Sequence, residues 1–570
     1  MTDAPRDLLE QHFETAFAAP NGIQKLRELI LTLAMQGKLV PQDPNDSPAS
    51  ELLRSIEAEK KRLVKERKIR APKTLPEVTA SDEPYSLPHG WQWVRLGAIG
   101  NIYNGNSINA SEKESKYAGV EGLPYIATKD VGYGFDPLDY DNGICIPPDE
   151  EKFRIAHQGA VLICAEGGSA GKKCGLTDRD ICFGNKLFAN ELFGQIPSRF
   201  ILYVYLSPVF RASFTAAMTG IIGGVSIAKF VEIPIPLPPL EEQHRIVAKI
   251  DQLMARCDAL ETLRKEREEK RLAVHAAAIQ QLLEAKDGSA WDFIQQHFGE
   301  LYTVKENVAE LRKAILQLAV MGRLVPQDPE DPPTSELLKE IDSEKQRLVK
   351  EKIIKSPKPV SSISQGGEPF QVPENWRWVR IAELAESIDY GTSQKTCDDS
   401  SLIPVYRMGN IVDGQLIDEG FKYIAPDIDE LPYLFLKPND ILFNRTNSYE
   451  LVGKSARYTG SANQATFASY LIRIRLFDAL LNPTFISQAM NAPYFRSTQI
   501  EPEIVQQCGQ ANFNGTKLSL CLIPLPPLPE QHRIVARIEQ LMALCDTLDQ
   551  KINDATDKQT ELLRAVMAQV

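Results

Sequence analysis

The tetrapeptide Asp331-Pro332-Pro333-Thr334 is one of two features of the 570-residue chain whose residue types could do chemistry. In adenine methyltransferases an Asp-Pro-Pro-aromatic sequence holds a flipped-out base by stacking an aromatic ring on it. Here threonine replaces the aromatic residue, and no glycine-rich strand–loop–helix pattern is present that would hold the methyl-donor cofactor. We therefore interpret the tetrapeptide as a helix start, and a self-contained DNA methyltransferase is disfavoured.

Two Gly-Lys sequences are the other such feature, because phosphate-binding loops end in Gly-Lys-Ser/Thr. Such a loop needs a further glycine five residues before the glycine of Gly-Lys. The first sequence has Glu166 there and Lys173 in place of Ser or Thr; the second, Gly453-Lys454, has Ser448 there. Both are predicted to be tight turns between strands, with a lysine at the tip that could contact a phosphate or a base edge.

Cysteine, histidine and hydropathy give no sign of a metal site or a membrane segment. None of the nine cysteines forms a CxxC pair, and no two histidines form an HxxxH pair. No run approaches 18 apolar residues, and the N-terminus MTDAPRDLLEQHFE lacks the pattern of a signal peptide. We expect a cytoplasmic protein with reduced thiols, no metal and no membrane contact.

The elements that would position functional residues occur twice in the chain. LPPLEEQHRIVAKIDQLMARCDAL from Leu237 recurs 288 residues later from Leu525, with 19 of 24 positions identical. LRELILTLAMQGKLVPQDP from Leu26 recurs 285 residues later from Leu311, with 13 of 19 identical. The same 285-residue offset relates two further pairs of sequences, those that begin at Ser50 and Ser335 and at Trp91 and Trp376.

The blocks between these repeats, residues 96–232 and 381–520, share little sequence. They are rich in Tyr, Ile, Val, Phe, Gly, Asn and Asp, which predicts short strands with many turns and a few helices. Each block, at roughly 140 residues, has the size of one domain. A duplicated frame with divergent blocks indicates one shared role for the frames and different roles for the blocks.

The repeated segments are predicted to be helices. After each Leu-Pro-Pro, apolar residues alternate in steps of four and three, a seam typical of coiled-coil-like packing. A first copy from about Glu241 to about Lys286 would span roughly 70 Å. The segments that begin at Ser50 and Ser335 form a second amphipathic helix, and Gly37 and Gly322 would end the helix before it.

These strings identify a family. PLPPLEEQHRIVAKID, PLPPLPEQHRIVARIE, GKLVPQDP and GRLVPQDP resemble hallmark sequences of the specificity (S) subunit of type I restriction-modification systems, and the resemblance covers the chain from about Ile23 to its end. It implies an α+β fold with an internal pseudo-two-fold repeat, in which two mixed target-recognition domains are separated by long antiparallel coiled-coil-like helices. The expected layout is an N-terminal extension (1–22), a helical region (23–87), target-recognition domain 1 (88–236), a central helical spacer with the second copy of the N-terminal hairpin (237–372), target-recognition domain 2 (373–524) and a C-terminal helix (525–570).

The resemblance also implies a function without bond chemistry on this chain. Each target-recognition domain would recognise one half of a bipartite, asymmetric target in double-stranded DNA. The duplicated helices would set the half-site spacing and dock two methyltransferase (M) subunits, and two restriction/motor (R) subunits would complete the complex. S-adenosylmethionine, ATP and Mg²⁺ would belong to those partners. The docking and spacer positions are Ile246, Ile250, Leu253, Leu260, Ile534, Ile538, Leu541 and Leu548.

Candidate DNA contacts follow from side-chain chemistry in turn-like stretches, because Arg, Lys, Asn and Gln recognise base edges, and Lys, Arg, Ser and Thr contact phosphates. In the first block the candidates are Asn106, Ser107, Lys129, Lys172, Lys173, Asn185 and Lys186. In the second block they are Thr392, Gln394, Lys395, Arg407, Arg445, Asn447 and Lys454. Two further lysines, which occupy matching positions just before the long helices, are Lys229 and Lys517.

The charge of the chain opposes strong DNA binding. Its net charge is −12, and neither block has an excess of basic residues: residues 88–236 carry 13 Lys and Arg against 15 Asp and Glu, and residues 373–524 carry 13 against 17. Because non-specific affinity comes from neutralised phosphates, we expect weak DNA binding by the chain alone. The alternative that composition allows is a structural adaptor whose two divergent domains bind proteins.

Overall fold

The computed structural model forms two compact units. Unit 1 comprises Met1–Arg267 and Ala555–Val570, and unit 2 comprises Glu268–Asp554. The residues that the structure describes are 17–219, 223–284, 289–356, 360, 363, 366–507 and 510–568. Most of the predicted N-terminal extension therefore lies outside the described residues.

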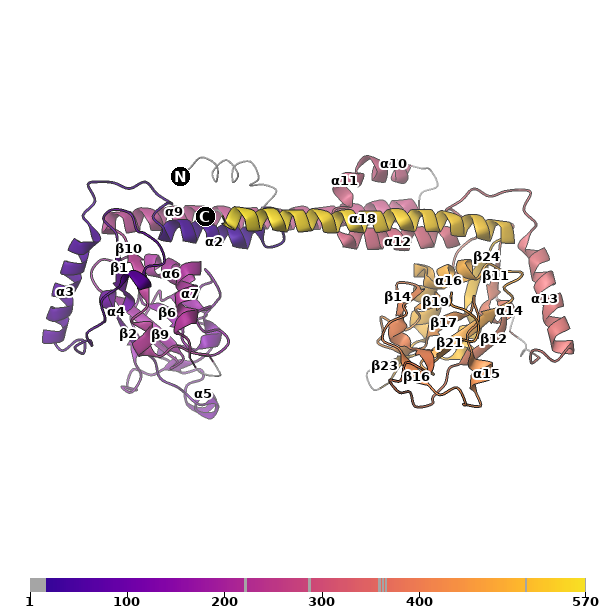
Figure 1. Cartoon of the computed structure of the whole chain (residues 1–570), viewed down its shortest axis with the longest axis horizontal. Coiled ribbons are helices and arrows are strands. Elements are labelled where there is room, and N and C mark those ends of the chain that lie inside the picture. Colours follow the sequence, from indigo (N-terminus) through magenta and orange to yellow (C-terminus); the bar gives the residue numbers. More distant parts are fainter. Residues whose placement is uncertain are drawn as a thin grey trace. The chain divides into compact units, whose positions relative to one another are not determined.

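Both units are built on the repeated helices (Figure 1). Unit 1 contains α2 (Gly22–Met35), α3 (Ala49–Lys65), the first part of α9 (Leu240–Glu284) and the last part of α18 (Leu528–Ala568). Unit 2 contains the rest of α9 and α18 with α10 (Ser289–Gln296), α11 (Phe298–Leu301), α12 (Lys305–Val320) and α13 (Thr334–Lys350). The predicted long helix is thus confirmed to within two residues at each end.

Equivalent ion pairs join the helices within each unit. Arg27 of α2 binds Asp258 and Glu261 of α9 at 2.7 and 2.8 Å. In unit 2, 285 to 288 residues later in the sequence, Arg312 of α12 binds Asp546 and Asp549 of α18, both at 2.8 Å. Gly37 and Gly322 both have φ of +66°, the left-handed conformation expected where α2 and α12 end.

A buried carboxylate explains why the strings around Gln-Asp-Pro and Glu-Gln-His-Arg are repeated. Glu242 is 1% exposed and accepts hydrogen bonds from Trp91 Nε1 at 2.8 Å and from Gln42 Nε2 at 2.6 Å. One helical turn later, Arg245 pairs with Asp46 at 2.6 Å. Burial raises the pKa of the Glu242 carboxyl, and these donors oppose that shift. Each string thus supplies one half of a network that ties the long helix to the loop before α3.

Unit 2 repeats this network. Glu530 is fully buried and accepts hydrogen bonds from Trp376 Nε1 at 2.9 Å and from Gln327 Nε2 at 2.6 Å. Arg533 pairs with Asp331 at 2.6 Å, so the aspartate of the Asp-Pro-Pro-Thr sequence is a structural residue. Helix α13 begins at the threonine of that sequence, which confirms its interpretation as a helix start.

The divergent block of unit 1 folds as two four-stranded sheets with short helices. The main sheet has the order β2-β9-β6-β7, the second sheet has the order β4-β3-β8-β5, and β1 pairs with β10. The strands are β1 (Gln92–Arg95), β2 (Gly100–Asn104), β3 (Leu123–Ile126), β4 (Cys145–Ile146), β5 (Ile155–Ala156), β6 (Val161–Cys164), β7 (Cys174–Leu176), β8 (Ile181–Phe183), β9 (Leu187–Leu192) and β10 (Pro234–Leu237). The helices are α4 (Leu96–Ile99), α5 (Ala110–Lys116), α6 (Ser198–Leu206), α7 (Pro208–Ala217) and α8 (Ile227–Phe230).

The block of unit 2 has the same plan despite its different sequence. Its main sheet has the order β12-β21-β17-β19, a second sheet has the order β16-β13-β20, and β11 pairs with β24. The strands are β11 (Arg377–Arg380), β12 (Ala385–Tyr390), β13 (Ile403–Tyr406), β14 (Ile411–Val412), β15 (Gln415–Leu416), β16 (Lys422–Ile424), β17 (Ile441–Asn444), β18 (Thr446–Asn447), β19 (Ser455–Arg457), β20 (Thr466–Phe467), β21 (Leu471–Leu476), β22 (Val505–Gln507), β23 (Gln510–Asn512) and β24 (Leu522–Leu525). The helices are α14 (Ile381–Leu384), α15 (Leu431–Leu434), α16 (Pro483–Asn491) and α17 (Gly515–Leu520).

Both Gly-Lys sequences lie in turns of the main sheets, as predicted: one between β6 and β7, the other between β17 and β19. Within the described ranges no single helix is long and apolar enough to cross a membrane; α6 and α7 pass that test only together, as a pair bent by 71°.

Candidate nucleic-acid interface

One edge of the main sheet of unit 1 gathers the predicted contact residues. Strands β2 and β6 are both antiparallel to β9, which lies between them. Their last residues, Asn104 and Cys164, pair with Phe188 and Leu187 at the start of β9. The loops that follow β2 and β6 and the loop that precedes β9 therefore meet at the same edge.

The structure places the unit 1 candidates around this edge. Ser107 follows β2, and Asn185 and Lys186 directly precede β9; all three are exposed. Asn106 is half-buried, and its Oδ1 accepts from the Arg154 backbone N–H at 2.9 Å.

A tyrosine hydroxyl holds the same loop. The hydroxyl of Tyr125 donates to the carbonyl oxygen of Asn106 at 2.7 Å. Burial raises the pKa of Tyr125 to about 12, so this hydroxyl remains a donor even in alkaline solution.

The three lysines of the β6–β7 turn and its neighbour also lie together. Lys173 Nζ donates to the carbonyl oxygen of Thr128 at 3.2 Å, which brings the turn next to Lys129. Its ammonium lies 5.0 Å from the ring centroid of Tyr133, a residue that is 55% exposed. Lys172 and Lys129 are exposed. This combination of ammonium groups and an exposed aromatic ring is typical of nucleic-acid contact surfaces.

The equivalent edge of unit 2 has the same topology. Strands β12 and β17 end at Tyr390 and Asn444, which pair with Ile472 and Leu471 at the start of β21. Gln394 and Lys395 follow β12 and are exposed, and Lys454, before β19, is half-buried. Arg445 directly follows β17, whereas Asn447 lies in the short strand β18, paired with Ala511 of β23.

Two unit 2 candidates are engaged inside the domain. Thr392 is 5% exposed, and its hydroxyl donates to Glu430 at 3.1 Å, so this side chain belongs to the packing of the domain. Arg407 donates to the carbonyl oxygen of Gly420 at 2.8 Å. It follows β13, whose last residue, Tyr406, accepts a backbone hydrogen bond from Ala468.

Each edge has its own backbone hydrogen bonds, and the two sets occupy equivalent positions. Asn106 N–H donates to Phe183 O, and Thr392 N–H donates to Phe467 O, both at 2.9 Å. The next pair in unit 1 is Ala165 N–H to Lys186 O at 2.8 Å, and in unit 2 it is Arg445 N–H to Tyr470 O at 3.0 Å. The loops of the two units therefore occupy matching positions and carry different side chains.

A glycine is required at each of these edges because the backbones approach closely. A Cβ at Gly105 would lie 1.9 Å from Phe183 O, and a Cβ at Gly391 would lie 2.3 Å from Phe467 O. Carbonyl oxygens of paired strands cannot move away as a flexible side chain can. Both glycines precede a predicted contact residue, and this shared position is the one signal by which the sequence could have aligned the two loops.

The matching lysines before the long helices differ in their surroundings. Lys229 and Lys517 both lie one turn into a short helix, capped by Ser226 and Asn514 respectively. Lys229 is exposed, whereas Lys517 pairs with Glu503 at 2.8 Å.

Exposed tyrosines at these edges were missed by the sequence reasoning, which searched only for charged, amide and hydroxyl side chains. Tyr133 in unit 1 is 55% exposed, and Tyr390 and Tyr470 in unit 2 are 45% and 46% exposed.

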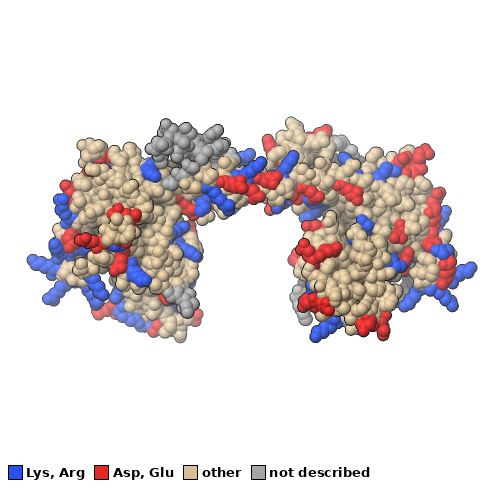
Figure 2. Space-filling view, viewed as in Figure 1, with Lys and Arg blue, Asp and Glu red and all other residues tan. Residues whose placement is uncertain are grey.

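Figure 2 shows Lys and Arg interspersed with Asp and Glu over the visible face of both units, without a continuous basic surface.

The helix seam is filled by the chain's own residues. Ile246 and Ile250 in unit 1 and Ile534 and Ile538 in unit 2 are at most 1% exposed and belong to the hydrophobic cores of their units. Side chains buried in this way cannot contact a separate subunit, so docking cannot involve these four residues directly. The remaining predicted positions are half-buried at Leu253, Leu541 and Leu548 and exposed at Leu260.

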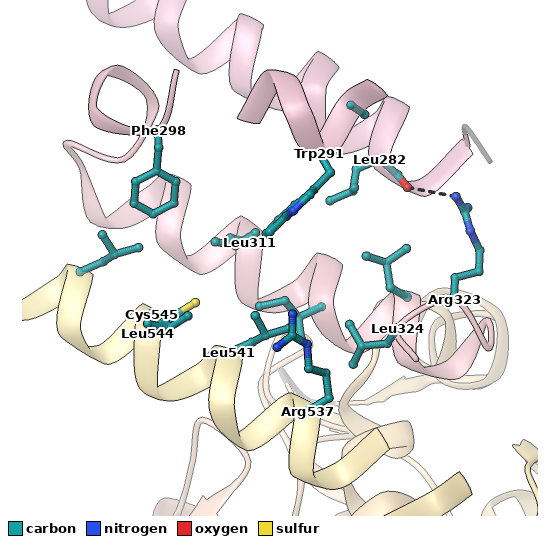
Figure 3. Close-up of a pocket in the computed structure, with 14 residues that line it drawn as sticks. Leu282, Trp291, Phe298, Leu311, Arg323, Leu324, Arg537, Leu541, Leu544 and Cys545 are labelled. Carbon is teal, nitrogen blue, oxygen red and sulfur yellow. Dashed lines mark hydrogen bonds between the residues drawn. The ribbon is translucent and has the colours of Figure 1, made fainter. Parts of the chain in front are cut away.

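An apolar cavity of about 630 Å³ opens beside the seam of unit 2 (Figure 3). Trp291 and Phe298, from α10 and α11, face Leu541 and Leu544 of α18 across it. Leu544 is 61% exposed, and Trp291 is 37% exposed.

The described residues contain no group of three or more His, Cys, Asp or Glu side chains that could hold a metal ion.

Comparison with known proteins shows the family to which the chain belongs. The model of the type I restriction modification DNA specificity domain matches residues 88–269 and 373–556. The specificity subunit of the type I restriction enzyme EcoAI of Escherichia coli is 34% identical over 95% of this chain and 92% of its own length.

A second relative shows the same family. The EcoEI specificity subunit, also of Escherichia coli, is 31% identical over 96% of this chain and 93% of its own length. Among solved structures, the HsdS subunit of Thermoanaerobacter tengcongensis is 18% identical, covers 86% of this chain and 98% of that chain, and has a TM-score of 0.41. The chain therefore belongs to the family of type I restriction-modification specificity subunits, non-catalytic proteins that carry no cofactor and give the system its DNA target specificity through two target-recognition domains.

Proposed function

We propose that each unit recognises one half of a bipartite, asymmetric target in double-stranded DNA through the loops at the edge of its main sheet. The observation that carries this proposal is the pair of matching loop frames with different side chains. Equal backbone frames would present both edges to DNA in the same manner, while different side chains would select different bases. The candidate residues named above stay predictions at the level of single contacts.

We further propose that the helical frame docks two M subunits, one per copy, and that two R subunits complete the complex. Duplication supports this, because two copies of one partner need two equivalent surfaces. Since the seam isoleucines are buried, docking would use less buried residues of the same helices, such as the equivalent pair Leu260, which is exposed in unit 1, and Leu548, which is half-buried in unit 2. S-adenosylmethionine, ATP and Mg²⁺ would be bound by those partners, and the complex would act in the cytoplasm.

The acidic balance of both blocks leads us to propose that the chain binds DNA weakly without its partners. Non-specific affinity requires basic side chains that neutralise phosphates. Tight binding of random DNA by the isolated chain at physiological salt would contradict this part of the proposal. The adaptor alternative loses its support now that the family is known.

A block exchange tests the proposed division of labour. Replacement of residues 96–232 by the equivalent block of another family member should change one half-site in the methylation motif and leave the other half-site unchanged. As a matched change, insertion of helical residues between Glu241 and Lys286 should alter only the number of base pairs between the half-sites. A block exchange that changes both half-sites would contradict the proposal.

A further inference from the structure

Arg445 stands at the centre of the unit 2 edge and is held from two sides. Its guanidinium carbon lies 4.9 Å from the ring centroid of Tyr390, and one terminal nitrogen donates to the carbonyl oxygen of Ser469 at 3.1 Å. Its Nε is buried and has no hydrogen-bond partner among the described residues. The protein therefore fixes the plane of this guanidinium, and because the Nε is buried, donation to a group from outside falls to the terminal nitrogens.

The charge of Arg445 is also not neutralised by a neighbour. Two buried or half-buried arginines of the same domain do have carboxylate partners: Arg473 pairs with Asp389 and Arg475 with Asp440. Within the described part of the chain, no Asp or Glu oxygen lies within ion-pair distance of Arg445. A guanidinium that is oriented but unpaired suits an acceptor group supplied from outside.

Tyr390 is itself a fixed and exposed platform. Its hydroxyl accepts a hydrogen bond from Gly515 N–H at 2.7 Å, while 45% of the residue remains exposed. Tyr470, which accepts the Arg445 backbone N–H through its carbonyl oxygen, is 46% exposed. Aromatic faces beside arginine are suited to contact with the edges and faces of bases.

Unit 1 has none of these three side chains at the matching positions. Asn104 ends β2 where Tyr390 ends β12. Ala165 and Lys186 form the backbone hydrogen bond that Arg445 and Tyr470 form in unit 2. Positions that share a backbone frame and differ in every side chain are those expected to separate the specificities of the two units.

We propose that Arg445 recognises a guanine in the half-site of unit 2, with its guanidinium donating to O6 and N7 in the major groove. This inference rests on the proposed function, because it assumes that unit 2 contacts a half-site through this edge. Tyr390 and the Ser469 carbonyl act as positioning groups that hold the fork in the plane of the base pair. A phosphate contact would need the charge alone, whereas the bidentate base contact needs this fixed plane.

The test is the substitution Arg445→Lys in the full chain, assembled with its M subunit. Lysine keeps the charge and loses the fork. Binding is measured to duplexes in which each base pair of the unit 2 half-site is replaced in turn. The parent should prefer guanine at one position by roughly ten- to a hundredfold, and Arg445→Lys should lose that preference there while every other position is unchanged.

A matched control is Arg457→Lys. Arg457 is half-buried, donates to Asn439 Oδ1 at 3.0 Å and lies in β19, outside the loops in question. This variant should keep the parent's preference at every position. Melting curves of both variants show whether each is folded; if Arg445→Lys is unstable, Tyr390→Ala is used, and it should weaken the same single preference.

The binding measurements distinguish a base contact from a phosphate contact at Arg445. Unchanged preferences in folded Arg445→Lys, or in the folded Tyr390→Ala variant that replaces it, would overturn the inference. So would a uniform loss of affinity for all duplexes, which indicates a phosphate contact. A parent complex that shows no base preference anywhere in this half would instead refute the proposed function itself.

Discussion

Trp376→Phe tests the network that joins the long helix to the rest of unit 2. The substitution removes the indole N–H that donates to Glu530 at 2.9 Å, while Gln327 still donates to the other carboxylate oxygen. A lost hydrogen bond to a buried charged group costs about 1.5–3 kcal/mol, and the smaller ring adds about 1 kcal/mol of lost packing. The free energy of unfolding should fall by about 2.5–4 kcal/mol, which lowers the melting temperature of a domain of this size by about 5–8 °C.

The loss should depend on pH. Burial raises the pKa of the Glu530 carboxyl, and the Trp376 hydrogen bond lowers it, so the variant raises that pKa further. A carboxyl whose pKa is higher in the folded than in the unfolded chain favours folding below its ordinary pKa and loses this contribution as the pH rises. Trp376→Phe should therefore be more destabilising at pH 8 than at pH 5.

The assay is calorimetry together with hydrogen exchange read by peptide. Trp91→Phe is the matched variant, because Trp91 donates to Glu242 in the same way in unit 1. Each variant should reduce protection in its own unit. A loss below about 0.5 kcal/mol for Trp376→Phe, or the same loss at both pH values, would show that the buried carboxylate does not depend on this donor.

Two further substitutions test the unit 2 edge. Gly391→Ala should cost about 3 kcal/mol and abolish recognition by unit 2, because its Cβ would lie 2.3 and 2.4 Å from two backbone oxygens; Gly409→Ala, whose Cβ would meet nothing within 4 Å, should be neutral in denaturant unfolding. Asp389→Asn should cost about 3–5 kcal/mol in the same assay, since it leaves the charge of fully buried Arg473 unpaired. Equal stability of Gly391→Ala and Gly409→Ala, or a loss under about 1 kcal/mol for Asp389→Asn, would contradict these assignments.

The helical frame could be predicted from the sequence because its signals are local and occur twice. The a/d spacing, the glycines that end α2 and α12 and the repeated strings each depend on residues close together in the chain. The role of the strings was not predictable, since Gln42 and Glu242 meet only in the folded unit.

The likeness of the two divergent blocks was hidden for a related reason. It lies in backbone hydrogen bonds such as those of Asn106 and Thr392, which any side chain permits. Strands of two to six residues carry too little sequence pattern to reveal a common sheet order. The burial of Thr392 and the exposure of Tyr390 likewise depend on tertiary packing, so a search by side-chain chemistry selected the first and missed the second.

The most direct test of the central claim is a single-molecule methylome of a host that expresses the M subunit, with and without this chain. If the chain selects the target, N6-methyladenine should occupy one split, asymmetric motif when the chain is present, and this methylation should be lost when the chain is removed. The same methylated motif in both hosts, or a single unsplit motif that depends on the chain, would contradict the account.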